Sequence, residues 1–247
     1  MWIILKYRCV LEIKGEDRRS FLQGLITQDV TKIKPREALY SLFLTNTGRF
    51  FCDFLMIEQE GSLLITPGKK CVEDFQKKLN FYKLRSDVEI KERSDWVVAA
   101  SLDDQEDRVY EGMIFKDPRH PKLGALFLGP KSSLKEHTET TKSYEDRRLE
   151  LGVPEGTLDL EQEKSIPLEN GMDALGAISW TKGCFLGQEL TARTKHVGTV
   201  RKKLLPFIVS EAVSVGETLT QKEGTGRVVS VYQEGKKGFA LVRVKYS

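Results

Sequence analysis

The stretch 182–189, KGCFLGQE, is the most informative part of this sequence. It brings a cation, a thiol, an amide and a carboxylate together over a few residues. Gly183 and Gly187 let the backbone approach a ligand closely or adopt a positive φ. Lys182, two positions before Cys184, is expected to favour the thiolate form of that cysteine. The stretch therefore predicts either a reactive cysteine site or a glycine-rich turn around a buried, inert cysteine.

The residues after Gly187 indicate a helix that begins at the end of this stretch. Its first N–H groups would point towards the cysteine, and Glu189 would suit the positive end of the helix dipole. A basic run, 190–209, follows without an acidic residue, and an acidic run, 150–163, precedes without a basic one. Each run is either a solvated face or, for the basic one, an anion-binding surface.

Composition excludes several classes of protein. The chain has 247 residues, with 39 Lys and Arg against 36 Asp and Glu, so the net charge is only +3. At about 150 residues per domain this length predicts one large or two modest domains. No apolar run approaches the ~18 residues that a membrane span needs. We therefore expect no membrane association, and charge alone does not argue for nucleic-acid binding.

The four cysteines lack the spacing of a metal site or a disulfide framework. Cys9 and Cys52 lie in alternating strand patterns and Cys71 opens a helical pattern, so all three are expected in the core. An intrinsic zinc or closed iron–sulfur site is not expected. Cysteines of this kind are typical of a reducing compartment. Together with the absence of an Arg- and Ser-rich leader, they predict that the protein is located in a bacterial cytoplasm, or in the mitochondrial matrix if the source is eukaryotic.

Hydrophobic periodicity predicts a mixture of strands and helices. The first expected strand is 7–14, in which Tyr7 and Cys9 share the apolar face and Arg8 lies on the polar face. The other segments expected as strands are 38–45, 50–58, 62–66, 88–90, 96–101, 109–115, 123–128, 204–209, 227–231 and 239–244. Those expected as helices are 17–26, capped by Asp17, 72–82, and 143–151, capped by Ser143. We expect an acidic loop at 103–107 and an irregular segment, 153–179, anchored by Ile166, Leu168 and Leu175.

The stretch 182–189 resembles the K-G-C-[FY]-x-G-Q-E signature of the YgfZ-type folate-binding proteins. That family is related to the aminomethyltransferase (T-protein) of the glycine-cleavage system and includes mitochondrial factors that help to mature iron–sulfur proteins. The resemblance spans nearly the whole chain. It extends to 15–30 (GEDRRSFLQGLITQDV), 45–54 (TNTGRFFCDF), 149–154 (LELGVP) and 167–170 (PLEN).

The resemblance implies an α+β, aminomethyltransferase-like fold with ring-like lobes. Residues 1–198 would form the folate-binding region, as two lobes divided near 95–140. Residues 199–247 would form a small C-terminal antiparallel β-barrel, which agrees with the short, glycine-punctuated strands expected there.

The resemblance also implies tetrahydrofolate as the ligand, bound in the central hole. Tyr144 would form an aromatic wall, Glu189 would bind the pterin and Arg193 would attract the glutamate tail. The residues expected to contact the ligand are Asp53, Tyr144, Asn170, Lys182, Gln188, Glu189 and Arg193. Ordinary roles stand beside these: helix packing for Tyr144, a turn for Asn170, a helix-terminal carboxylate for Glu189 and a solvated surface for Arg193.

Three functions follow from the resemblance. Transferase relatives carry paired aspartates where this chain has Cys52-Asp53, so proton transfer at the folate nitrogen lacks one carboxylate and enzyme activity is disfavoured. A factor for iron–sulfur cluster assembly or repair is favoured, with Cys184 as its functional thiol. One cysteine cannot hold a cluster. A transient [2Fe–2S] cluster would therefore be shared with a partner of the A-type carrier class. A one-carbon transferase and a tRNA-modification-associated protein, binding tRNA through 190–209, are the alternatives.

Overall fold

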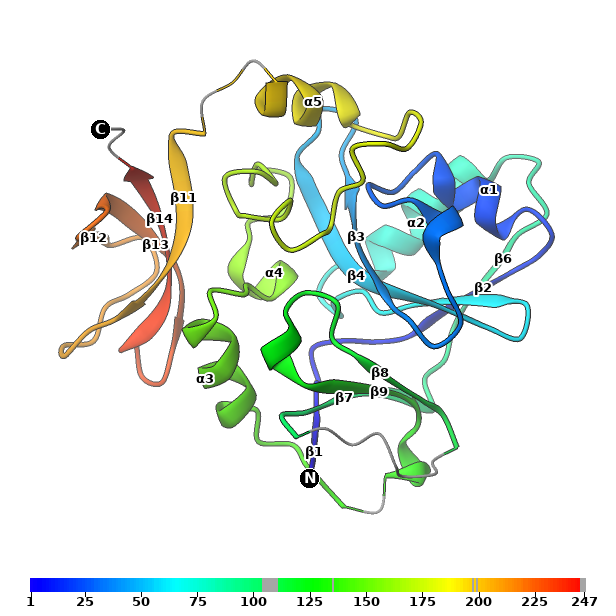
Figure 1. Ribbon diagram of the computed structural model, residues 1–247, viewed down its shortest axis with the longest axis horizontal. Helices are drawn as coiled ribbons and strands as arrows, with labels where there is room; N and C mark the ends of the chain where they lie inside the picture. Colours follow the sequence, from blue (N-terminus) through cyan, green and yellow to red (C-terminus); the bar gives the residue numbers. More distant parts are fainter. Residues whose placement is uncertain (104–110, 135, 197, 199, 245–247) are drawn as a thin grey trace.

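Three β-sheets form the molecule and surround an irregular segment (Figure 1). The computed structural model describes residues 1–103, 111–134, 136–196, 198 and 200–244. The loops of residues 160–180, drawn in yellow-green, run through the space between the sheets. This arrangement agrees with the expected α+β class and its ring-like lobes.

The largest lobe contains a five-stranded antiparallel sheet in the order β3-β4-β5-β2-β6. Its strands are β2 (Leu11–Lys14), β3 (Leu39–Leu44), β4 (Phe50–Gln59), β5 (Ser62–Ile65) and β6 (Glu89–Glu92). Two helices belong to this lobe, α1 (Arg18–Gln23) and α2 (Val72–Lys83), and their apolar faces join the strands in one buried core. The predicted hairpin around Asn46–Arg49 is the β3–β4 connection.

A second five-stranded sheet has the order β10-β1-β7-β9-β8. Its strands are β1 (Trp2–Ile4), β7 (Trp96–Ser101), β8 (Met113–Lys116), β9 (Ala125–Pro130) and β10 (His137–Thr138). Strand β1 pairs with β7 antiparallel and with β10 parallel, so the chain's first residues lie inside this sheet. The sequence pattern did not predict β1, because three consecutive buried residues show no alternation.

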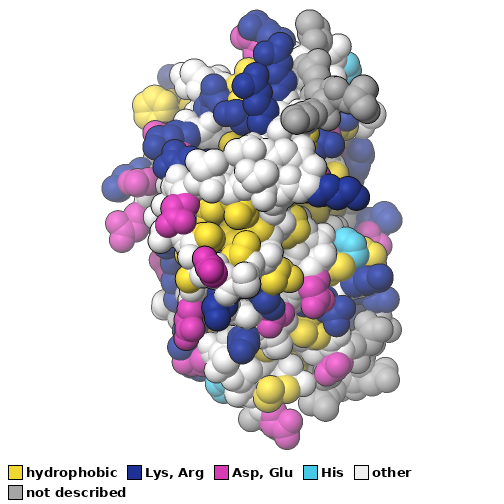
Figure 2. All heavy atoms as spheres, turned by 90° about the vertical axis from the view of Figure 1, so that its left-hand side faces the viewer, with side chains coloured by type: hydrophobic (Ala, Val, Ile, Leu, Met, Phe, Trp, Pro, Cys, Tyr) yellow, Lys and Arg dark blue, Asp and Glu magenta, His cyan; other side chains and the backbone are white. Residues whose placement is uncertain are grey.

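The C-terminal sheet has the order β11-β14-β13-β12. Its strands are β11 (Lys202–Ile208), β12 (Thr218–Gln221), β13 (Gly224–Tyr232) and β14 (Lys237–Val244). The edge strands approach each other, since Gln221 Nε2 on β12 donates to the Pro206 carbonyl on β11 at 3.1 Å. Figure 2 views the molecule from the side of this sheet and shows a hydrophobic band with Lys and Arg side chains gathered above it.

Three further helices connect the sheets: α3 (Lys142–Glu150), α4 (Gly156–Asp159) and α5 (Gln188–His196). Short 3-10 turns lie at Val30–Lys32, Pro121–Leu123 and Lys131–Ser133. As expected, α5 begins directly after Gly187 and Leu168 anchors the irregular segment in the core. Among the described residues, no helix is both long and apolar enough to span a membrane.

Several local predictions were wrong. Thr141, not Ser143, precedes α3, and Asp17 precedes α1 without a side-chain cap because its carboxylate accepts from the Asp87 amide. Arg8 was placed on a polar face but is only 3% exposed. Most of the expected acidic loop at 103–107 lies outside the described residues.

Candidate functional site

Cys184 lies on the loop between Ser179 and α5, and it is the one exposed cysteine of the four. Cys9, Cys52 and Cys71 are buried, as the sequence predicted. Burial raises the pKa of the Cys9 thiol to about 12 and also raises the pKa of Cys52. The thiol of Cys184 is therefore the one that a partner or reagent can reach.

Lys182 fixes the loop just before Cys184. Its Nζ donates to the carbonyl oxygens of Gln23 at 2.7 Å, Ile26 at 2.7 Å and Gln28 at 2.9 Å. These three bonds use all three ammonium protons on the turn that follows α1. Burial lowers the pKa of Lys182 to about 8, partly offset by the charge of Asp29. Lys182 thus binds backbone carbonyls, which is a different role from the predicted thiolate stabilisation.

The residues just after Cys184 are fixed as well. Leu186 N donates to the Gly24 carbonyl at 3.0 Å, which attaches the loop to the same turn. Gln188 Oε1 accepts from Phe185 N at 3.2 Å, at the start of α5. Cys184 is therefore held between two anchored segments while its own side chain faces solvent.

Gly187 packs directly against the β3–β4 hairpin. Its φ is +78°, and a Cβ there would lie 2.3 Å from the Thr45 carbonyl oxygen. Gly48 faces it from the hairpin, where a Cβ would lie 2.6 Å from the Gly187 carbonyl oxygen. Neither position has room for a side chain. This close approach explains why the two glycine motifs, 139 positions apart (187 − 48), occur together.

An aromatic and cationic surface flanks the loop. Lys195 Nζ lies 5.1 Å from the centre of the Trp180 ring, and His196 contacts the same ring edge-on at 6.4 Å between centroids. Trp180 is 40% exposed, which is unusual for so large an apolar side chain. The loop thus presents a thiol beside a surface that suits protein contact.

A buried ion network occupies the region between the lobes. Arg8 donates through Nη2 to Asp53 Oδ2 at 2.7 Å and through Nε to Glu155 Oε1 at 2.5 Å. Arg119 donates to the other oxygen of Glu155 at 2.9 Å and to the Tyr144 hydroxyl at 2.5 Å. Burial by itself would raise the pKa of Glu155, but the surrounding arginines lower it to about 2.

The network extends towards the C-terminal sheet. Arg148 Nη1 donates to Asp159 Oδ2 at 2.6 Å, and the Tyr232 hydroxyl donates to Asp159 Oδ1 at 2.6 Å. Glu155 and Asp159 belong to the acidic run 150–163, yet both are about 2% exposed. These two carboxylates are therefore partners of buried arginines and not part of a solvated face.

Sequence reasoning missed this network. Arg8 interrupts an apolar run, and the acidic run 150–163 contains no basic residue, so its carboxylates could be buried only with cations from outside the run. Those two facts were the available signals. The partner of Arg8 could not be identified, because Glu155 lies 147 positions away.

The residues predicted to contact folate lie in separate places. Asp53 and Tyr144 belong to the buried network, and Asp53 packs directly against the backbone of α4, since a Cβ on Gly156 would lie 1.6 Å from Asp53 Oδ1. Glu189 and Arg193 are exposed on α5 and pair with each other at 2.7 Å. Lys182 and Gln188 bond within the loop, and Asn170 Nδ2 donates to the Ile166 carbonyl at 2.8 Å. The seven residues do not converge on one site, so folate binding stays a prediction.

Known proteins share the sequence of this chain over most of its length. The mitochondrial iron–sulfur cluster assembly factor IBA57 of Mus musculus is 30% identical over 272 aligned positions, covering 96% of this chain and 75% of that protein. The chain belongs to the IBA57 family. The human IBA57 protein is 29% identical, with 95% of this chain and 75% of that protein covered. The homologue of Pyricularia oryzae is 30% identical over 95% of this chain and 66% of its own length.

The fold is that of a glycine-cleavage T-protein. The aminomethyltransferase T of Bartonella henselae superposes with a TM-score of 0.75 over 98% of this chain and 78% of that protein, at 13% identity. The predicted aminomethyltransferase-like fold is therefore confirmed. The IBA57 relatives are mitochondrial proteins, which agrees with a matrix location in a eukaryotic source. No family model matches the chain.

Proposed function

We propose that this protein assists the assembly of iron–sulfur clusters and that Cys184 provides a thiolate ligand to the cluster as cargo. The IBA57 relatives are iron–sulfur cluster assembly factors by name. The observation that supports the role of Cys184 is its exposure on a loop anchored on both sides, in a chain whose other three cysteines are buried.

The cluster would be shared with a second protein. A [2Fe–2S] cluster takes four protein ligands, usually thiolates. Among the described residues, no group of three or more His, Cys, Asp and Glu side chains is arranged to bind a metal ion. The remaining ligands therefore come from a partner, and we propose an A-type carrier protein for that role. On binding, Cys184 releases its proton to solvent and its thiolate takes one coordination position.

The surface beside the loop suits such a transient complex. Trp180 provides an apolar contact, and Lys195, which lies over its ring, pairs with Asp173. The exposed Arg193 pairs with the exposed Glu189 on α5. Aromatic side chains and arginines are enriched in protein–protein interfaces. The proposed partner would contact this surface while its own thiolates complete the cluster.

A reconstitution experiment tests this function. The protein is mixed with a cluster-loaded A-type carrier, and complex formation is followed by gel filtration and by visible absorption of the [2Fe–2S] chromophore. We expect a coloured heterocomplex with wild-type protein and none with Cys184→Ser. Thr181→Ala, an exposed change on the same loop, is the control and should behave as wild type. An equally coloured, equally stable complex with Cys184→Ser would contradict the proposal.

Tetrahydrofolate is a further proposed ligand, taken from the resemblance alone, and no step of the proposed function depends on it. Titration of the purified protein with tetrahydrofolate tests it, comparing wild type with Asn170→Ala and Arg193→Gln. Saturable binding that weakens in these variants would support the predicted site. Aminomethyl transfer and tRNA binding stay alternative proposals, testable by turnover with an aminomethyl donor and by salt-dependent RNA binding.

A further inference from the structure

A groove of about 610 Å³ lies between the C-terminal sheet and the segment 161–170. Cations line both of its walls. Lys202, Arg227 and Arg243 belong to the sheet, and Arg49 and Lys164 belong to the opposite wall. The groove is separate from the Cys184 loop, and none of the residues 180–196 lines it.

The strand register places like charges directly opposite each other. Lys202 on β11 is the cross-strand partner of Arg243 on β14, and Thr225 on β13 is the next partner of Arg243. Arg227, two positions after Thr225, lies on the same face because side chains alternate along a strand. Leu204, two positions after Lys202, packs against the core of the main body, so this face points into the groove. Like charges directly opposite each other destabilise a sheet.

Carboxylates do not neutralise these cations. In the part of the chain that the structure describes, no carboxylate oxygen lies within 4 Å of the side-chain nitrogens of Arg49, Lys202, Arg227 or Arg243. The groove also contains three acidic residues. Asp159 is bound to Arg148 and Tyr232, and Glu161 pairs with Lys164 at 3.7 Å. Only the carboxylate of Glu169 is left to face the four unpaired cations among the described lining residues.

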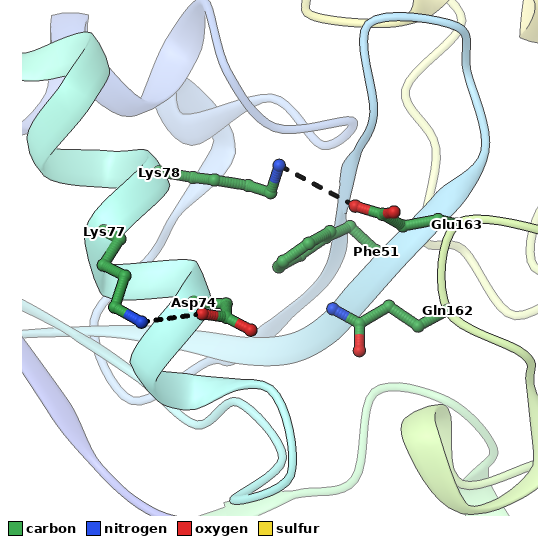
Figure 3. A pocket seen from close by; sticks show the side chains of 6 residues that line it. All are labelled: Phe51, Asp74, Lys77, Lys78, Gln162 and Glu163. Carbon is green, nitrogen blue, oxygen red and sulfur yellow. Dashed lines mark hydrogen bonds and ion pairs between the residues drawn. The ribbon is translucent and has the colours of Figure 1, made fainter.

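A second groove on the molecule shows the usual pattern. It has a volume of about 560 Å³ and lies between α2 and Gln162–Glu163 (Figure 3). There Lys77 pairs with Asp74 at 3.0 Å and Lys78 with Glu163 at 3.8 Å. Carboxylates pair with both lysines of that groove. The two grooves therefore differ, because the cations of the groove beside the C-terminal sheet lack such partners.

We propose that the groove beside the C-terminal sheet binds a multivalent oxyanion, a compound with two or more separated phosphate or carboxylate groups. Lys202 and Arg243 would contact one group from the sheet. Arg49 would contact another from the opposite wall, where its Nη1 already donates to the Lys164 carbonyl at 3.1 Å and its remaining N–H donors are available. The bound anion would remove the repulsion between Lys202 and Arg243 and would join the sheet to the main body.

Calorimetric titration of the full chain with pyrophosphate and with tri-glutamate tests this site, in 150 mM NaCl to screen non-specific attraction. We expect one molecule bound per chain, and at least a tenfold loss of affinity in the double variant Lys202→Gln, Arg243→Gln. The control double variant, Lys203→Gln with Lys222→Gln, removes the same charge. Lys203 lies on the opposite face of β11 and Lys222 in the β12–β13 turn, so the control should bind as wild type.

Glu169→Gln should change the affinity in the opposite direction, because removing the unpaired carboxylate should tighten the binding of both probes. If pyrophosphate binds more tightly than tri-glutamate, the site prefers phosphate groups; the reverse order indicates a preference for carboxylate groups. The unliganded Lys202→Gln, Arg243→Gln protein should unfold at a temperature no lower than wild type, since it loses a repulsion. Absence of binding by both probes, or an equal loss of affinity in the two double variants, would overturn the proposal.

Discussion

Arg8 Nε donates to Glu155 Oε1 across 2.5 Å, although 147 positions separate the two residues. Their side chains are 1% and 2% exposed. Arg8 also donates to Asp53 on β4 and to the Thr66 carbonyl, so all three connections lie within one buried site. The pair thus joins the start of the chain to the turn before α4, at the place where the lobes meet.

Arg8→Met should strongly destabilise the protein, because it leaves the carboxylates of Glu155 and Asp53 with fewer partners in the interior. Removal of one partner from a buried ion pair costs about 3–5 kcal/mol. Urea unfolding measures the loss. Lys14→Met, an exposed change on the neighbouring strand β2, is the control and should alter the free energy of unfolding by less than about 0.5 kcal/mol. Similar stability of the two variants would show that the network is not needed for folding.

Acid should weaken the fold through Glu155. Its pKa is lowered to about 2 in the folded protein, against 4.5 as its ordinary value, so the folded state binds fewer protons than the unfolded state between these pH values. The resulting stability is fully present above pH 4.5 and is lost as pH falls towards 2, and it amounts to a few kcal/mol. Unfolding free energies from pH 6 to pH 2 measure the slope. Glu155→Gln should be less stable at pH 6 and should show a shallower slope, and an unchanged slope would contradict this assignment.

Lys182→Met should loosen the loop that carries Cys184. The variant leaves the carbonyls of Gln23, Ile26 and Gln28 without their shared donor, and each unsatisfied buried group costs about 1–3 kcal/mol before water compensates. Hydrogen exchange of the Leu186 amide, which donates to Gly24, measures the change and should become faster. Lys195→Met, on exposed α5, should leave that exchange rate unchanged. Equal protection in all three proteins would mean that Lys182 does not anchor the loop.

Gly187→Ala should destabilise the protein, whereas Gly183→Ala in the same loop should be tolerated. A Cβ at Gly187 meets the Thr45 carbonyl oxygen at 2.3 Å and the residue has φ +78°, whereas a Cβ at Gly183 meets nothing within 4 Å. Strain at a positive φ costs about 1–3 kcal/mol, and the backbone clash adds to it. Thermal unfolding of the two variants measures the contrast. If both lower the midpoint equally, the contact between Gly187 and the β3–β4 hairpin is not what selects glycine.

A thiol reagent should modify one cysteine in the native protein and four after unfolding. Cys184 is exposed, and Cys9, Cys52 and Cys71 are buried. A chromogenic disulfide reagent at pH 8 counts the reactive thiols directly. Cys184→Ser should react at none before denaturation and at three afterwards. Rapid modification of a second cysteine in the folded wild type would contradict the burial of Cys9, Cys52 or Cys71.

The sequence correctly predicted those helices and turns whose structure is determined by residues close together in the chain. The hairpin around Asn46–Arg49, the helix α2 and the start of α5 after Gly187 follow from turn chemistry and periodicity, which act over short distances. Strand β1 was missed because it is buried on both faces and so shows no alternation. Edge strand β12 was missed because it is short and polar, and β13 supplies its only strand pairing among the described residues.

For the candidate site, the sequence identified Cys184 and the glycines beside it, because a cation, a thiol and two glycines in one stretch already indicate chemistry. It misjudged the role of Lys182, since the direction of a lysine side chain depends on which carbonyls are nearby, and these come from residues 23–28. The central network was out of reach for a similar reason. Charges such as Arg8 and Glu155 are expected at the surface unless their partner is known, and here the partner is far along the chain.

The position of strand β1 has a consequence for the order in which the protein can form. β1 leaves the ribosome before its partners β7 (Trp96–Ser101) and β10 (His137–Thr138), because both lie much later in the chain. Glu155, the ion-pair partner of Arg8, is synthesised later still. This apolar strand therefore has no strand partner until residues 96–101 are made, and it lacks its second partner until residues 137–138 are made. Such long-range pairing slows folding and exposes nascent chains to aggregation, so folding of this protein should benefit strongly from chaperones that bind β1 while it is unpaired.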